Sequence, residues 1–382
     1  LLVPPGADAS SRASLRDEAI NDLELSSVVR GMSRRGISEA GLLGVLTELP
    51  QDPDEIVYRQ ETMRCFWNDE QLCEEMDELV RMMQEVTVFA RSGQETDRPL
   101  LESIYRLGEL EVYVDLVTRM RRVLERVPGR SRGLEQLLAE LREREADPSF
   151  SELARELPTL RAGFKVHQSV TIGVNLDDKL RPVEAALLGI NDRSFREGHF
   201  LGGFLGKAIG DPYITRTPLA RTATTGDIFG AGAERLPLAP LFEELDSVLR
   251  PMLRPLARAL RTYVSVNTEI FRRLFPEVAF FLGARSWLRE IADAGYPFCF
   301  PGILPPDRRL TAFRGLYNLR LASHWGPDGA SRMVTNDVGL DGAARLFVLT
   351  GPNGGGKTTF TQALGIATVL GQLGLPVPAE SA

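Results

Sequence analysis

One stretch of the sequence combines glycines, a lysine and a threonine in the spacing of a phosphate-binding loop. It fits the pattern G-x-x-x-x-G-K-[S/T] and reads Gly351-Pro352-Asn353-Gly354-Gly355-Gly356-Lys357-Thr358. Glycines let the backbone turn tightly, so that successive N–H groups point toward one anion. The lysine ammonium of such a loop reaches the β- and γ-phosphates, and the hydroxyl of Thr358 would bind Mg²⁺. This stretch, together with Thr359, therefore predicts a site for ATP and Mg²⁺.

The residues on both sides of this loop could hold it in place. Arg345–Thr350 is an apolar run that predicts a strand, and a helix is predicted from Lys357 to about Leu373. The N-terminus of that helix would add the positive end of its dipole to the phosphate site. Another strand is predicted at Leu316–Ala322. The alternative interpretation of the loop is a glycine-rich turn that binds nothing.

Hydrolysis of ATP needs residues beyond the loop. An acidic residue on a second strand, the Walker B position, holds Mg²⁺, and another group orients the attacking water. Between Lys357 and Ala382 the only carboxylate side chain is that of Glu380. We therefore expect the chain to be truncated inside its nucleotide domain, to contain no complete catalytic site and to be inactive alone.

The N-terminal part of the chain is predicted to be helical from Asp22 to about Arg161. Asp52-Pro53-Asp54-Glu55 has the residue types of a helix start, and it would place Ile56, Met63 and Phe66 on one face. A longer helix is predicted after Pro99. Its apolar residues recur every three or four positions and are Leu100, Ile104, Leu107, Leu110, Val114, Val117, Met120 and Leu124. These patterns are typical of a structural helical bundle.

The pattern changes at Ser169. Ser169–Leu176 and Val183–Ile190 predict a β-hairpin. Gly198–Arg235 is rich in glycine and is predicted to be a loose segment, either a solvated linker or an arm that contacts nucleic acid. Helix is predicted again from Ala239 to Ala294, and the Pro- and Gly-rich stretch Gly295–Pro306 predicts a domain boundary.

These patterns predict a mainly α chain followed by the start of an α/β P-loop ATPase domain. The expected parts are a helical core (1–168), a β-hairpin with a glycine-rich insertion (169–238), returning helices with a linker (239–306), and the truncated ATPase domain (307–382).

The overall composition limits the possible functions. A net charge of −7 argues against binding nucleic acid through overall charge, although a local basic stripe could still do so. The three cysteines, Cys65, Cys73 and Cys299, have no metal-ligand spacing and suggest a reducing compartment, most simply the cytoplasm. The apolar stretches are too short for a membrane span, and the N-terminus does not have the pattern of a signal peptide.

The sequence around the loop resembles the MutS family of DNA mismatch-repair ATPases. The family's loop reads TGPNMGGKST, so Gly354 replaces a methionine and Thr358 replaces a serine. Asn336-Asp337 and the closing run Gly374-Leu375-Pro376-Val377-Pro378-Ala379 also match the family's pattern. ABC-type ATPases have a similar loop, GPNGAGKTT. The Val-Pro-Ala ending and the long helical stretch before the loop favour MutS.

The resemblance implies that the insertion in 169–238 is clamp-like and that 239–306 contains returning lever or core helices. It also implies a function for the intact protein. It implies ATP and Mg²⁺ as cofactors, double-stranded DNA as partner, a homodimer, and ATP binding that moves helical arms around the duplex. Met333 falls where the family often has an aromatic residue stacked on adenine, which leaves that contact open. The family's mismatch-reading members carry an N-terminal Phe-x-Glu wedge. Phe195-Arg196-Glu197 lies mid-chain, and we interpret that match as a coincidence, so the chain is similar to MutS-related proteins without the mismatch-reading domain.

Other functions stay open on the sequence alone. The chain could be a DNA-binding or dimerising scaffold with little nucleotide role, or an ABC-type ATPase. A cluster of arginines on the long helix, Arg119, Arg121, Arg122 and Arg126, could contact DNA phosphates, but the interleaved glutamates favour a solvated helix face. His167, His199 and His324 show no ligand spacing. Trp67, Trp287 and Trp325 are expected to be packing residues.

Overall fold

A computed structural model describes most of the chain. The described residues are 1–4, 12–33, 39–95, 99–165, 169–176, 178–179, 182–191, 193, 196–197, 214–215, 259–260, 263, 268–342 and 346–382. They fall into two compact units. The first unit contains Leu1–Val88, Val112–Pro148 and Asn267–Ala382, and the second contains Phe89–Glu111 and Ser149–Val266.

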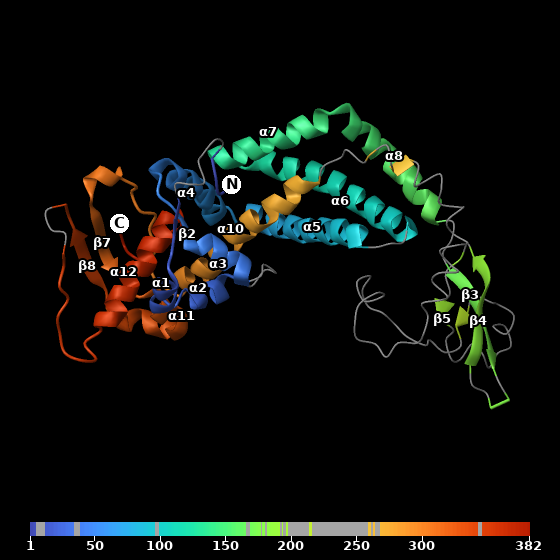
Figure 1. Ribbon diagram of the computed structural model, residues 1–382. Helices are drawn as coiled ribbons and strands as arrows, with labels where there is room; N and C mark the ends of the chain where they lie inside the picture. The colour runs from blue at the N-terminus through green and yellow to red at the C-terminus, as the bar shows by residue number, and fades with distance from the viewer. Residues whose placement is uncertain are drawn as a thin grey trace. The chain divides into compact units, whose positions relative to one another are not determined.

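The described elements are mainly helices (Figure 1). The helices are α1 (Asp17–Asp22), α2 (Leu25–Met32), α3 (Glu39–Thr47), α4 (Pro53–Asn68), α5 (Glu70–Glu95), α6 (Pro99–Arg126), α7 (Arg132–Ala146), α8 (Pro148–Lys165), α10 (Glu269–Asp293), α11 (Leu319–Trp325) and α12 (Lys357–Gln372), with the 3-10 turns η3 (Pro306–Arg308) and η4 (Pro327–Arg332). The strands are β1 (Arg12–Ser14), β2 (Glu48–Pro50), β3 (Ser169–Leu176), β4 (Pro182–Asn191), β5 (Arg196–Glu197), β6 (Ile214–Thr215), β7 (Thr311–Leu316) and β8 (Asn336–Leu340). They pair as β1–β2, β3–β4 and β7–β8, all antiparallel, and as parallel β5–β6.

Helix α4 begins where the sequence predicts. The side chain of Asp52 accepts a hydrogen bond from the backbone N–H of Asp54 at 3.0 Å, and Pro53 occupies the first turn. Met63 and Phe66 are fully buried. The ring of Phe66 stacks on Phe281 of α10 with 5.8 Å between ring centroids. Helix α10 also packs against α2 and α3, so these four helices form the core of the first unit.

The long helix predicted after Pro99 is confirmed as α6. Its apolar stripe is buried at Leu107, Leu110, Val117, Met120 and Leu124, as the repeat of three or four residues requires. Ile104, in the same series, is 40% exposed and does not join the buried face.

The predicted β-hairpin is also confirmed. Strands β3 and β4 pair antiparallel with Ser169 opposite Asn191, and the side-chain amide of Asn191 donates to the hydroxyls of Ser169 and Thr171 at 3.2 and 3.0 Å. The predicted loose segment Gly198–Arg235 lies outside the described residues except for the two residues of β6. Most of the first half of the predicted helix 239–294 also lies outside them. The bounds of the four predicted parts stay predictions.

Both strands predicted near the phosphate loop are wrong. At Leu316–Ala322, β7 ends at Leu316 and α11 begins at Leu319, because Asn318 caps a helix there. Residues 346–350 form no strand, and Leu346 and Val348 are 83% and 78% exposed. A strand forms only where a neighbour pairs with its backbone, and no described segment pairs with this run. Arg345 lies outside the described residues.

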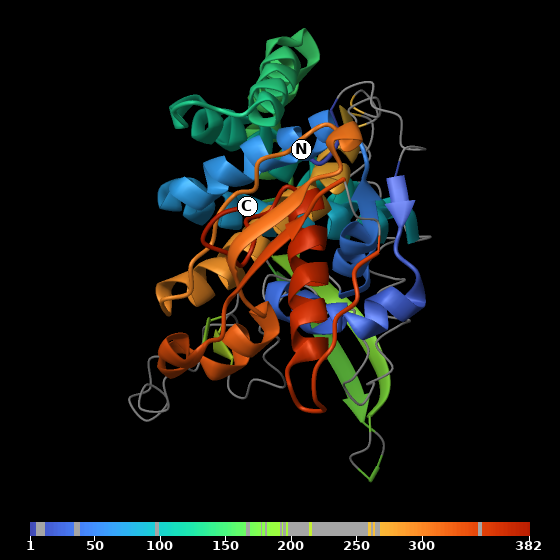
Figure 2. The same cartoon turned by 90° about the vertical axis from the view of Figure 1, so that its left-hand side faces the viewer.

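The helix predicted after the loop is confirmed as α12, which ends at Gln372. Both views show it beside β7 and β8 (Figures 1 and 2). The described residues therefore agree with a mainly α chain, but they contain no parallel sheet around the loop. Among the helices of the described ranges, none is both long and apolar enough to span a bilayer. Cys65, Cys73 and Cys299 form no disulfide within the described residues.

Candidate nucleotide site

The glycine-rich loop has a backbone conformation that depends on glycine. Gly354 and Gly356 both have φ of 79°, a left-handed conformation that side chains disfavour. Gly354 stands where the MutS-type loop has methionine, so this loop uses a turn that methionine would rarely adopt. The one turn within the loop is closed by the N–H of Gly355, which donates to Pro352 O at 3.1 Å.

Backbone donors at the start of α12 are open. The first helical hydrogen bond runs from the N–H of Phe360 to Gly356 O at 2.9 Å. The N–H groups of Lys357 and Thr358 precede it and have no acceptor in the described part of the chain. Such donors, together with the helix dipole, form an anion site without any side chain.

Lys357 adds the positive charge of the loop. Its ammonium donates to Gly351 O and to Pro352 O, both at 2.7 Å. An ammonium has three donors, so one remains without a partner among the described residues. The loop carbonyls thereby hold the charged group over the loop while leaving it able to contact an anion.

A pocket of about 600 Å³ opens beside the loop. This volume lies in the usual range for small-molecule sites. Among the predicted residues, Gly354, Gly355, Gly356, Lys357 and Thr359 line it, whereas Gly351, Pro352, Asn353 and Thr358 do not. Thr358, the expected Mg²⁺ ligand, is exposed. The rest of the lining comes from α11 and its cap, from α12, from the start of β8 and the segment before it, and from the residues before the loop: Asn318, Leu321, Trp325, Met333, Val334, Asn336, Asp337, Leu349, Thr350, Phe360 and Ala363.

Asn318 fastens the pocket's two helices to one another. Its side-chain oxygen accepts from the N–H of Leu321 at 3.1 Å and so caps α11. Its side-chain nitrogen donates to Thr359 O, in the first turn of α12, at 2.9 Å. Sequence reasoning missed this residue because Leu316–Ala322 was expected to be a strand. An asparagine directly before Leu-Arg-Leu-Ala was the available signal for a helix cap.

Glu24 connects the same two helices to the N-terminal segment. Its carboxylate accepts from Arg320 of α11 at 2.7 Å and from the amide of Gln362 of α12 at 3.4 Å. The Gln362 amide also donates to Asp22 O at 2.9 Å. These contacts fix α11 and α12 on the α1–α2 junction.

The run that follows α12 packs into the helical core. Leu375, Val377 and Ala379 are fully buried, and Val377 pairs with Cys299 through hydrogen bonds of 2.8 and 3.2 Å. Gly374 has φ of 75° and lies against the backbone of Gln60 in α4. The Gly-x-x-Val-Pro-Ala motif is therefore a structural joint between α12 and α4.

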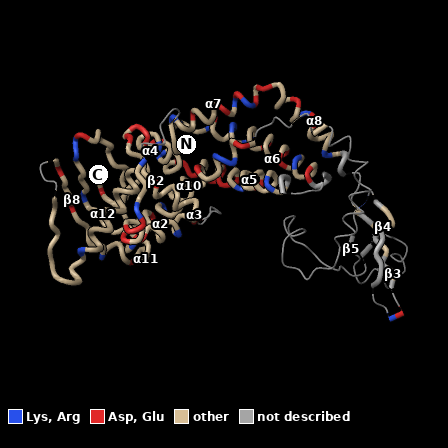
Figure 3. Tube along the Cα trace, viewed as in Figure 1, with Lys and Arg blue, Asp and Glu red and all other residues tan. Residues whose placement is uncertain are grey.

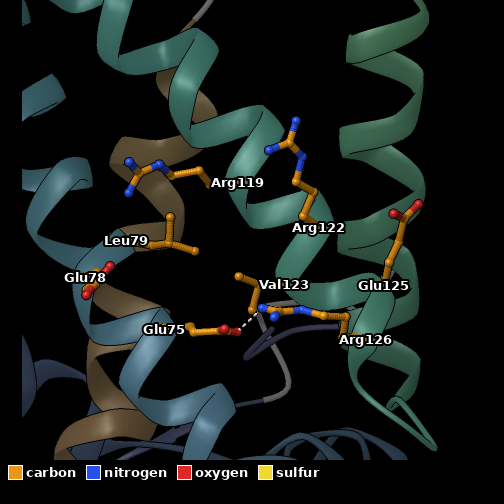
Figure 4. Close-up of a pocket in the computed structure, with 8 residues that line it drawn as sticks. All are labelled: Glu75, Glu78, Leu79, Arg119, Arg122, Val123, Glu125 and Arg126. Atoms are coloured by element: carbon orange, nitrogen blue, oxygen red, sulfur yellow. Dashed lines mark hydrogen bonds and ion pairs between the residues drawn. The ribbon is translucent and has the colours of Figure 1, made fainter.

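The arginine cluster on α6 faces a second pocket, of about 550 Å³ (Figure 4). Three glutamates and three arginines line it, so its charges balance. Arg126 pairs with Glu75, and Arg119 pairs with Asp115 at 3.1 Å. Arg121, the fourth predicted residue, pairs with Glu125 and Glu145 instead. Figure 3 shows both charge signs interleaved along α5, α6 and α7, which favours the solvated-face interpretation over a phosphate-binding stripe.

The remaining candidate residues divide between packing and the pocket. Trp287 is buried in α10, and Trp67 packs against Phe298 and Phe300. Trp325, expected to be a packing residue, is 40% exposed and lines the pocket beside the loop. His167 and His199 lie outside the described residues. Within the described ranges no group of His, Cys, Asp and Glu side chains could hold a metal ion.

Comparison with known proteins identifies the family. Residues 51–294, which make up more than half of the 382-residue chain, match the model of the MutS2 N-terminal domain. The chain belongs to this family, and so to the MutS-type proteins. Membership favours the MutS interpretation of the loop over the ABC interpretation.

Individual relatives match over shorter stretches. The DNA mismatch repair protein MutS of Granulibacter bethesdensis is 35% identical over 93 residues, which are 24% of this chain and 10% of that protein. Endonuclease MutS2 of Lactococcus lactis subsp. cremoris is 45% identical over 51 residues, 13% of this chain and 7% of that protein. Endonuclease MutS2 of Bacillus velezensis is 45% identical over 49 residues, which are 13% of this chain and 6% of that protein. The matched stretches thus span a tenth or less of these relatives.

Proposed function

We propose that this MutS2-family protein is a DNA-binding ATPase. In this proposal it binds ATP with Mg²⁺ at Gly351–Thr359 and couples that binding to a conformational change around double-stranded DNA. The role is in mismatch repair or a related DNA process, and the intact protein acts as a homodimer. The observation that carries the nucleotide part is the loop with the pocket beside it: the loop has open backbone donors and a lysine ammonium, and the pocket has an aromatic wall. The DNA part rests on the family and on the printed names of the relatives.

Each loop residue has a distinct role in the proposal. The N–H groups of Lys357 and Thr358 would contact phosphate oxygens, and the Lys357 ammonium would neutralise the β- and γ-phosphates. The Thr358 hydroxyl would help to hold Mg²⁺, which would supply further positive charge to offset that of the phosphates. Hydrolysis would additionally need an acidic residue that holds Mg²⁺ and a group that orients the attacking water.

The contacts of α11 and α12 connect the phosphate loop to the helical core. Phosphate binding would act on the N-terminus of α12, which Asn318 ties to α11, and Glu24 ties both helices to the α1–α2 junction. Movement at the loop would therefore be transmitted to packed helices and not absorbed by a free loop.

The nucleotide claim is tested by titrating labelled ATP with Mg²⁺ against the intact protein and its Lys357→Ala variant. We expect the variant to bind at least tenfold more weakly, which corresponds to about 1.4 kcal/mol. Thr368→Ala, an exposed change on the same helix but outside the pocket, serves as the control and should bind as the unmodified protein does. Equal affinity in all three proteins would favour the rival function, a DNA-binding or dimerising scaffold with little nucleotide role.

A further inference from the structure

Trp325 presents a large aromatic side chain to the pocket beside the phosphate loop. It is the last residue of α11 and is 40% exposed. A single exposed apolar residue is ordinary on a protein surface. This one differs because it lines a pocket that also contains Lys357 and the glycines of the loop.

The backbone at Trp325 is fixed by hydrogen bonds. Gly326 follows it with φ of 62°, and its N–H donates to Ala322 O at 3.2 Å to end α11. Gly326 O accepts from the hydroxyl of Tyr296 at 2.9 Å and from the N–H of Gly329 at 3.1 Å. The ring of Tyr296 is buried and lies 5.6 Å from that of Tyr317. The position of the tryptophan is therefore set by the core.

The turn after α11 packs directly against the indole. A Cβ added at Gly329 would collide with the Cβ atom of Trp325 and would lie 3.2 Å from the Cε3 atom of the Trp325 indole. It would also lie 2.6 Å from the Tyr296 hydroxyl. Only glycine leaves room for the turn η4 to support the ring so closely. The indole is thus backed by the turn η4, and Trp325 lines the pocket while 40% exposed.

The chemistry of the lining divides the pocket into two kinds of surface. Met333, Val334 and Leu321 join Trp325 as apolar or polarisable wall. Lys357 and Asp337 are the only charged side chains among the described lining residues, and Asp337 accepts from the N–H of Gly315 at 2.8 Å. A ligand that fits both surfaces has a flat apolar ring and an anionic group. A nucleoside triphosphate has both, and inorganic triphosphate has only the second.

We propose that Trp325 is the base-contacting residue of this site, with Met333 as a second wall. The indole stacks on the nucleobase of a ligand whose phosphates lie on the loop, and the larger ring system of a purine gains more from that stacking than a pyrimidine. The site therefore selects purine nucleoside triphosphates over pyrimidine nucleotides and inorganic triphosphate. This inference rests on the proposed nucleotide function.

The test measures Mg²⁺-dependent binding of ATP, GTP, CTP and inorganic tripolyphosphate to the intact protein and its variants. Trp325→Ala should weaken ATP and GTP binding about tenfold, or ~1.4 kcal/mol. The same change should weaken CTP binding less and leave tripolyphosphate binding unchanged. Trp325→Phe retains a ring and should restore most of the affinity for ATP. Trp67→Phe, a packing tryptophan outside this pocket, should change none of the four affinities.

Tryptophan fluorescence supplies a second measurement that does not depend on the alanine variant folding. Saturating ATP should quench the emission of the protein, and Trp325→Phe should remove that quench while Trp67→Phe keeps it. Unchanged ATP affinity in Trp325→Ala, together with weak binding by Lys357→Ala, would overturn the role of Trp325 and leave the nucleotide function standing. Failure of the unmodified protein to bind any of the four ligands would overturn both.

Discussion

The side chain of Asn318 makes two hydrogen bonds that stabilise different helices. One caps α11, and the other holds the first turn of α12 through Thr359 O. The second bond acts on the helix that begins at Lys357, so Asn318 is a positioning residue for the proposed phosphate site. It touches no phosphate-binding atom of the loop that the structure describes.

Two variants of Asn318 separate the effects of these two hydrogen bonds. Asn318→Ser retains a capping oxygen but cannot reach Thr359 O, whereas Asn318→Ala loses both bonds. We expect both variants to bind ATP severalfold more weakly, and only the alanine variant to lose about 1 kcal/mol of capping energy as well. ATP titration and urea unfolding of each variant measure the two effects. Unaltered ATP affinity in the serine variant would show that Asn318 serves only α11.

Burial controls the chemistry of the Cys299 thiol. Desolvation raises the pKa of Cys299 to about 11, because the thiolate would lose water beside the buried Val377 segment. The folded state thus prefers the protonated thiol more than the unfolded chain does. The resulting stability is complete below the unfolded value of about 9 and is lost as pH rises toward 11.

The raised pKa of Cys299 predicts that the stability of the protein depends on pH, and Cys299→Ala isolates this dependence. The urea midpoint of the protein should fall between pH 9 and pH 11, and the fall should be smaller in Cys299→Ala. The same burial should make Cys299 slow to react with thiol reagents at pH 7, since the thiolate is the nucleophile. Rapid labelling of Cys299 in the folded protein, mapped by mass spectrometry, would contradict the raised pKa.

At the scale of elements, the joint between α12 and α4 depends on a glycine. A Cβ at Gly374 would lie 2.6 Å from Gln60 N and 2.7 Å from Arg59 Cβ. Because those neighbours belong to a buried helix, they cannot move aside cheaply. The φ of 75° adds a second cost to any side chain at this position.

Gly374→Ala should therefore destabilise the protein by ~2–5 kcal/mol, the sum of left-handed strain and overpacking. Gly129→Ala is a matched control, because Gly129 also has positive φ (58°) but has open space around its Cβ position. The control should cost only the strain, roughly 1–2 kcal/mol. Urea denaturation measures both, and equal losses would mean that the packing of α12 on α4 adds nothing.

Local signals explain which elements could be predicted from the sequence. The cap at Asp52, the apolar repeat of α6 and the glycines before α12 act within a few residues, and the three helices that they predict are present. The hairpin β3–β4 is also local. The run at 346–350 could not be assigned in this way, because its backbone needs a partner from elsewhere in the sequence. The loop residues of the site were predicted, whereas Asn318 and Trp325 reach the pocket only through the tertiary fold.

At the scale of the whole molecule, the distribution of charge limits where DNA could bind. Three arginines of α6, Arg119, Arg121 and Arg126, pair with glutamates or an aspartate, and both charge signs are interleaved along this helix (Figure 3). A phosphate group would have to displace those carboxylates before it could pair with the arginines. We infer that this face does not supply the DNA contacts of the proposed function.

Reversing the charge of Arg122, which has no ion-pair partner among the described residues, tests that inference. Arg122→Glu should leave the affinity for double-stranded DNA and its salt dependence unchanged, because a residue that contacts no phosphate releases no counterion. Arg121→Glu is the same charge reversal on the same helix. Unlike Arg122→Glu, it breaks ion pairs, those of Arg121 with Glu125 and Glu145. A flatter salt dependence in Arg122→Glu would place the helix against the DNA.

The central claim is that nucleotide bound at Gly351–Thr359 changes how the intact protein holds DNA. It is tested most directly by measuring the affinity for double-stranded DNA at fixed salt, with and without a non-hydrolysable ATP analogue and Mg²⁺. We expect at least a fivefold change in DNA affinity for the unmodified protein, about 1 kcal/mol of coupling, and no change for Lys357→Ala. The same DNA affinity with and without the analogue in the unmodified protein would contradict it.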